Sequence, residues 1–103
     1  MRTQESLINN IRTSAGDVTA LASDEYVGIT NTDQIRTVTL PAAASVGAGR
    51  VITIKDQSGA AGTNKITVDG NASETIDGAT TKDITTNYGS LRLFCNGTAW
   101  FSI

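Results

Sequence analysis

The chain has 103 residues, of which 39% are hydrophobic and 5% aromatic, and it carries a formal net charge of −2 without any histidine. This length suits one small domain, and the scattered lysines and arginines form no basic stripe of the kind that nucleic acids require. No apolar run approaches the length of a membrane span or of a secretory leader, so we expect a soluble chain made in the cytoplasm. Its small aliphatic core favours oligomerisation.

Residues 1–23 differ from the rest and are expected to form an N-terminal arm. Leu7, Ile8 and Ile11 recur at helical spacing and predict a short helix over residues 4–12. A helix of this length is not stable alone in water, so it must dock on another surface. That surface is either its own domain or a sister subunit or scaffold, and the sequence does not separate the two. The three apolar residues are the candidate partner-binding residues.

From Asp24 onward, apolar residues recur at every second position and are separated by polar ones. A strand points successive side chains to opposite faces, so this pattern gives each strand one buried and one wet face. The predicted strands cover residues 25–29, 36–40, 50–56, 65–69, 74–77, 82–86, 90–95 and 98–103. We therefore expect an all-β domain over residues 24–103, a small sandwich or jelly-roll-like unit of about eight short antiparallel strands.

The connections between these strands carry their own signals. Residues 41–49 (PAAASVGAG) predict a loop or a single loose helical turn, and residues 57–64 predict a flexible connection. Asn96-Gly97 between two alternating runs is typical of a two-residue hairpin loop. The hairpin carries Trp100 and Phe101, whose large rings are expected in the core. Cys95, in the same ribbon, is expected to be a packed thiol.

The residue types disfavour catalysis and metal binding. Without histidine, serine and Cys95 lack the usual base that activates a nucleophile. One cysteine and no histidine exclude structural zinc, and Asp69-Gly70-Asn71 lacks the spaced oxygen ligands of a calcium loop. An ion held by oxygen ligands at a subunit axis stays open. We expect no enzyme and no cofactor, and we interpret Asn71 and Asn96, although both match glycan acceptor motifs, as turn residues.

The stretch TVTLPAAASVGAGRVITIKDQSGAAGTNKITVDGNASETIDGATT, followed by NYGSLRLFCNGTAWFSI, resembles a module of tailed-bacteriophage virion proteins. Similar segments occur in fibres, spikes and capsid decoration (cement) proteins. The likeness covers roughly residues 24–103 and includes the Leu40-Pro41 corner, the ITVDG and ETIDG segments and the closing Asn96-Gly97-Thr98-x-Trp100. It implies a homotrimeric, non-enzymatic structural protein of the virion, made in the cytoplasm of the bacterial host.

Three functions are compatible with that likeness. The leading hypothesis is a trimeric capsid decoration protein that binds the major capsid protein and stabilises the head shell, because no shaft repeat precedes Asp24. The first alternative is the receptor-binding tip of a tail fibre or spike, which would bind host surface polysaccharide through residues 57–64 and 71–73. The second alternative is a tail or baseplate accessory protein. The sequence leaves head and tail locations open.

Overall fold

The computed structural model describes residues 10–103. The elements are β1 (Ile11–Ser14), β2 (Val18–Thr19), β3 (Tyr26–Ile29), β4 (Arg36–Thr39), α2 (Ala43–Val46), β5 (Val51–Asp56), β6 (Ile66–Asp69), β7 (Thr81–Ile84), β8 (Ser90–Cys95) and β9 (Trp100–Ser102). This content confirms the all-β class. The single turn of helix in α2 also agrees with the prediction for residues 41–49.

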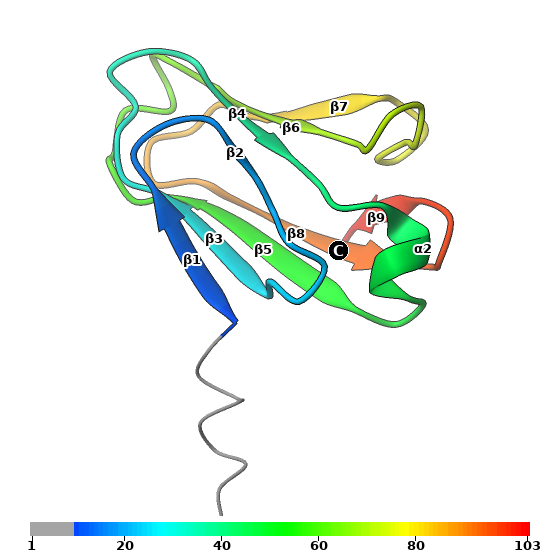
Figure 1. Ribbon diagram of the computed structural model, residues 1–103. Coiled ribbons are helices and arrows are strands. Elements are labelled where there is room, and N and C mark those ends of the chain that lie inside the picture. The colour runs from blue at the N-terminus through cyan, green and yellow to red at the C-terminus, as the bar shows by residue number, and fades with distance from the viewer. Residues whose placement is uncertain (1–9) are drawn as a thin grey trace, which may run out of the picture.

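The strands form two facing sheets, and the chain crosses between them at each of the early strands (Figure 1). One sheet has the order β1-β3-β5-β8-β9, and the other has the order β2-β4-β6-β7. The chain therefore winds as a coil, placing odd-numbered strands in one layer and even-numbered strands in the other as far as β6. The two layers diverge toward the end that carries α2 (Figure 1).

Much of the strand pairing is parallel, which corrects the expected antiparallel arrangement. Within residues 10–103, four of the seven strand pairs are parallel, namely β1–β3, β2–β4, β3–β5 and β4–β6. These pairs depart from the antiparallel strands of a jelly roll. Alternation predicts one buried face but not the direction of a neighbouring strand. Parallel strands usually lack alternation because helices cover both faces of their sheet. Here each crossover is a strand of the other sheet, so the outer face of each sheet is left uncovered.

The core lies between the two sheets and is built mainly from aliphatic side chains. Its buried members are Ala20, Val27, Ile29, Val38, Leu40, Ala43, Ile52, Ile54, Ala61, Ile66, Val68, Ile76, Ile84, Leu93, Cys95 and Trp100. Trp100 is only 1% exposed, as predicted, but Phe101 is 40% exposed, so its predicted place in the core is wrong. Adjacent residues of one strand point to opposite faces, and β9 can bury only one of these two rings.

Part of the predicted N-terminal arm belongs to the sheets. Ile11–Ser14 forms β1, which pairs with β3, and Val18–Thr19 forms β2, which pairs with β4. The predicted helix over residues 4–12 is therefore wrong at its end, where Ile11 and Arg12 are extended; residues 4–9 lie outside the described part. Three apolar residues at helical spacing do not outweigh backbone pairing, because a short isolated helix gains little by itself.

A second correction concerns the strand predicted at residues 74–77. In this segment Ile76 forms only isolated bridges, one with Ala79 and one with Trp100. Asp77 has a φ of 52°, which lies outside the extended region and turns the chain. The segment therefore forms a tight turn over the end of the core instead of a strand.

The C-terminal hairpin is confirmed, but its loop is longer than predicted. Cys95 pairs with Trp100, so four residues, 96–99, form the connection instead of two. The Asn96 side-chain oxygen accepts hydrogen bonds from the backbone N–H groups of Thr98 (2.9 Å) and Ala99 (2.8 Å). Gly97 takes a φ of 99°. The side chain of Asn96 thus organises a wider loop than the two-residue type that Asn-Gly favours.

Candidate functional site

The outward surface of the five-stranded sheet carries a group of apolar side chains that are exposed or half-buried. Strand register places Val51, Phe94 and Phe101 in one row across β5, β8 and β9. A second row runs across β1, β3, β5 and β8 and contains Ile11, Tyr26, Thr53 and Arg92. We call the surface formed by these seven side chains the A face. Exposed apolar groups beside charged ones are typical of protein interaction surfaces.

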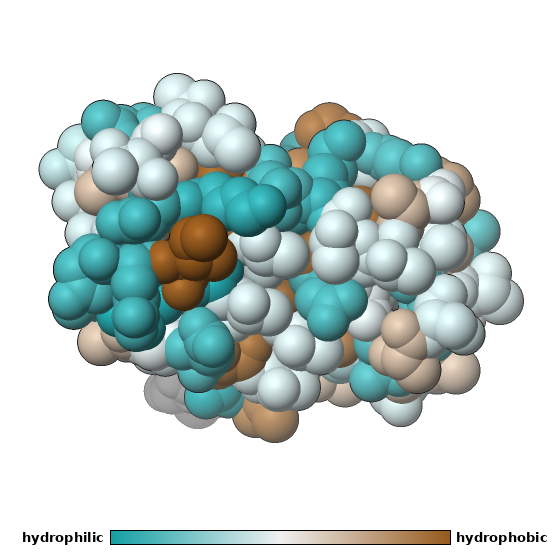
Figure 2. Space-filling model, turned by 90° about the horizontal axis from the view of Figure 1, so that it is seen from above, coloured by the Kyte–Doolittle hydropathy of each residue, from teal (hydrophilic) through white to brown (hydrophobic). Residues whose placement is uncertain are grey.

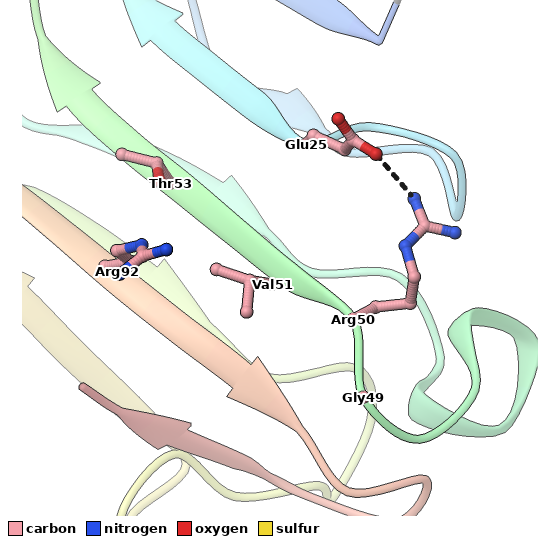
Figure 3. Close-up of a pocket in the computed structure, with 6 residues that line it drawn as sticks. All are labelled: Glu25, Gly49, Arg50, Val51, Thr53 and Arg92. Atoms are coloured by element: carbon pink, nitrogen blue, oxygen red, sulfur yellow. Dashed lines mark ion pairs between the residues drawn. The ribbon is translucent and has the colours of Figure 1, made fainter. Parts of the chain in front are cut away.

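A shallow, open depression of about 410 Å³ lies on the A face (Figure 3). Its lining residues are Glu25, Gly49, Arg50, Val51, Thr53 and Arg92. The Arg50 guanidinium lies 3.6 Å from the Glu25 carboxylate and also donates to the Ser23 carbonyl oxygen at 3.4 Å. Arg50 is therefore held at the rim of the depression.

Arg92 differs from Arg50 because it has no such contact. Arg92 lies in β8 after the partly buried Leu91 and before the buried Leu93, and its own side chain is exposed. No hydrogen bond or ion pair joins its guanidinium to any residue of the described range 10–103. Its planar head can bind a carboxylate through two parallel hydrogen bonds. The A face thus offers one unoccupied cation beside aromatic and aliphatic groups.

The opposite outer surface, on the four-stranded sheet, is formed mainly by threonine and aspartate side chains. Register places Thr37, Thr67 and Asp83 in one row and Thr19, Thr39, Asp69 and Thr81 in the next. We call the surface of these seven side chains the B face. Figure 2 looks down on this side of the molecule and shows mostly hydrophilic and neutral atoms, with a compact hydrophobic patch and smaller hydrophobic areas near the margins. A second shallow depression, of about 330 Å³, lies between β2 and β4 on this side.

Of the three predicted partner-binding residues, the structure places one. Ile11 is 62% exposed and stands beside Tyr26 at the β1 edge of the A face. Leu7 and Ile8 lie outside the described residues. The role of all three in partner binding stays a prediction.

The residues considered for other chemistry serve local structure. Cys95 is buried, as predicted, and its Sγ lies 3.6 Å from the Ala43 carbonyl oxygen. Asp77 accepts hydrogen bonds from the hydroxyl and the N–H of Ser102, which together with Lys82 at 3.3 Å lower the pKa of its carboxyl. Among residues 10–103, no three or more His, Cys, Asp or Glu side chains gather where they could hold a metal ion.

The carboxylate of Asp56 organises the end of the molecule opposite α2. It is fully buried and accepts hydrogen bonds of 2.9 to 3.0 Å from the N–H groups of Ser58, Gly59, Ala61 and Tyr88. Burial raises the pKa of Asp56, but these four hydrogen bonds outweigh it and hold the pKa below its ordinary value. Residues 57–64, predicted to be flexible, are therefore tied to β5.

Two features were not predicted from the sequence. The Arg92 side chain has no hydrogen-bond or ion-pair partner among residues 10–103, and Asp56 binds two separate segments of the chain. The alternation in β8 already indicates that Arg92 faces outward, but only the structure shows that its guanidinium makes no hydrogen bond or ion pair within residues 10–103. Asp56 is readable as a turn residue because Ser58 and Gly59 follow it. Its hydrogen bond to Tyr88 depends on tertiary structure and leaves no local signal.

No protein-family model and no curated protein matches this chain. In the range 10–103, no helix has both the length and the apolar character needed to cross a membrane. The function must therefore be inferred from the surfaces described above.

Proposed function

We propose that this chain is a structural virion protein of a tailed bacteriophage, a homotrimeric capsid decoration protein that binds the major capsid protein and stabilises the head. The observation that carries the proposal is the A face, a sheet surface that presents exposed apolar side chains and a free arginine. The resemblance of residues 24–103 to virion modules is the reason for proposing a phage particle as the binding partner. The role is mechanical and involves no enzyme chemistry and no cofactor.

The mechanism follows from mass action. A protein that binds the assembled shell, but not its separated subunits, stabilises the shell by the free energy of its own binding. Several contacts on one trimer act together, so modest individual affinities add to strong retention. The apolar residues Leu7, Ile8 and Ile11 supply the anchors to the shell, since apolar anchors usually dominate such interfaces.

The test uses phage heads prepared without this protein. Purified protein is added, and its copy number per head and the temperature at which heads release DNA are measured. We expect saturable binding in multiples of three and a higher release temperature. Removal of residues 1–9 eliminates Leu7 and Ile8 but retains β1 and β2, and it should lower occupancy. Absence of the protein from heads, with recovery in purified tails, would contradict the proposal.

A second candidate, the receptor-binding tip, is favoured by Tyr88. Its side chain is 60% exposed, and its ring lies against Gly59, where an added Cβ would come within 2.5 Å of the ring. An exposed aromatic ring among polar loops is typical of carbohydrate recognition. Binding of the purified protein to host cell-surface polysaccharide, lost in Tyr88→Ala and retained in Thr86→Ala, would favour this function over decoration. Thr86 is also exposed in the same connection and therefore serves as the control.

A further inference from the structure

Two charged side chains stand apart from all others in the described part of the chain. Within residues 10–103, every Asp, Glu, Lys and Arg makes at least one hydrogen bond or ion pair through its side chain, except Arg92 and Asp69. These two carry opposite charges. Each is presented on a strand, at a position fixed by the backbone hydrogen bonds of its sheet.

Arg92 and Asp69 cannot meet within one chain, because they lie on opposite outer surfaces. Arg92 belongs to the A face of the five-stranded sheet, and Asp69 belongs to the B face of the four-stranded sheet. The core separates the two sheets. Within residues 10–103, neither charge has a group of opposite sign that binds it.

The charged residues around Arg92 and around Asp69 also differ in sign. Arg50 and Lys55 add positive charge on the side of Arg92, where Glu25 is the acidic residue. Asp17 and Asp83 add negative charge on the side of Asp69, where Lys65 pairs with Asp83 at 3.1 Å. Surfaces of opposite charge attract each other and select the relative orientation of two proteins.

We propose that a second copy of this chain occupies the A face from β5 to β9, with its B face against this part and its Asp69 paired with Arg92, so that Ile11 at the β1 edge stays available to the shell. The contact is head-to-tail, because two different surfaces meet, so each end of an open row keeps one face free for the next copy. Head-to-tail contacts build a ring when the rotation between copies closes.

The remaining groups suit such a contact. Threonine methyl groups on the B face pack against Val51, Phe94 and Phe101 of the A face, while threonine hydroxyls stay available to water and to polar neighbours. The ion pair sets the register, and the apolar row supplies buried area. This inference rests on the homotrimer included in the proposed function and specifies which surfaces form it.

The test is a charge exchange on the intact chain. Arg92→Glu and Asp69→Lys are prepared singly and together, and the oligomeric state is measured by sedimentation over a range of concentrations and salt. We expect the wild type to form a trimer and each single variant to associate at least about tenfold more weakly. The double variant, which restores opposite charges across the contact, should regain association. Higher salt should weaken the wild-type trimer, since salt screens the pair.

A control variant, Gln34→Glu, adds one negative charge at an exposed loop residue between β3 and β4 that belongs to neither face. It should associate as the wild type does. Unfolding midpoints of all variants confirm that each is folded. Single variants that associate normally, or a folded double variant that does not recover, would overturn the inference. A wild-type monomer at every concentration would overturn it as well, whereas the decoration role is decided separately by occupancy on heads.

Discussion

The backbone N–H of Tyr88 donates a 3.0 Å hydrogen bond to the carboxylate of Asp56, thirty-two residues earlier in the chain. This bond joins the end of β5 to the turn that precedes β8, its antiparallel neighbour. The same carboxylate holds three N–H groups of the loop that follows β5. One buried side chain therefore fixes two connections at this end of the domain.

Replacement of Asp56 should destabilise the fold strongly. Asp56→Ala leaves four backbone N–H groups without their acceptor, and we expect a loss of about 3 kcal/mol in the free energy of unfolding. Asp56→Asn keeps one acceptor oxygen and should lose less. Urea unfolding monitored by Trp100 fluorescence measures both. The control is Asp83→Ala, whose exposed ion pair with Lys65 contributes about 1 kcal/mol at most. Equal losses in the two alanine variants would contradict the assigned role.

Asp56 also makes stability depend on acid pH. Its pKa is lowered in the folded protein, so the folded state holds the proton less tightly than the unfolded chain does. The stabilisation is therefore complete above the unfolded pKa of roughly 4 and is lost as pH falls through the folded pKa. Asp77, whose pKa is lowered chiefly by hydrogen bonds from Ser102, contributes in the same direction. Unfolding free energies from pH 7 to 2 should converge for wild type and Asp56→Asn at the acid end; a constant difference would argue against this linkage.

The two rings of β9 should respond differently to truncation. Trp100→Ala removes a fully buried ring, and we expect a loss of roughly 3 to 5 kcal/mol. Phe101→Ala truncates a side chain on the A face and should cost less than about 1 kcal/mol in a monomer. Calorimetry of both variants at low concentration makes the comparison. A large loss for Phe101→Ala in the monomer would place its ring in the core after all.

Gly70 should not tolerate a side chain. A Cβ at this position would lie 2.3 Å from the backbone oxygen of Glu74, in the turn that follows β6. Gly70→Ala must displace that backbone, and we expect a loss of about 1 to 3 kcal/mol. Gly16 is the matched control, because a Cβ there meets nothing within 4 Å. Thermal unfolding of Gly70→Ala and Gly16→Ala should show a lower midpoint in the first variant only.

The sequence was informative where one local rule decides the structure. Alternation correctly located β5, β6 and β8, because burying one face fixes which residues point inward. It also identified Cys95 and Trp100 as buried. The C-terminal hairpin followed from a turn signal between two such runs.

The predictions from the sequence were wrong where the structure depends on pairing between segments far apart in the chain. Whether Ile11 is helical or extended depends on the presence of β3, and parallel pairing depends on how the chain crosses between layers. The candidate site is predictable only in part for the same reason. The outward direction of Arg92 can be read from β8, but its lack of an ion pair within residues 10–103 cannot.

The winding of the chain between two layers has a consequence for how the protein folds. Among the strands of residues 10–103, β6–β7 and β8–β9 are the pairs of consecutive strands, and each of β1 to β5 takes a partner at least two strands further along the chain. A domain rich in such distant pairings is expected to refold over milliseconds to seconds. During synthesis on the ribosome, β1 and β2 emerge before any strand that can pair with them, and nascent chains must be kept from aggregating until β3 and β4 follow.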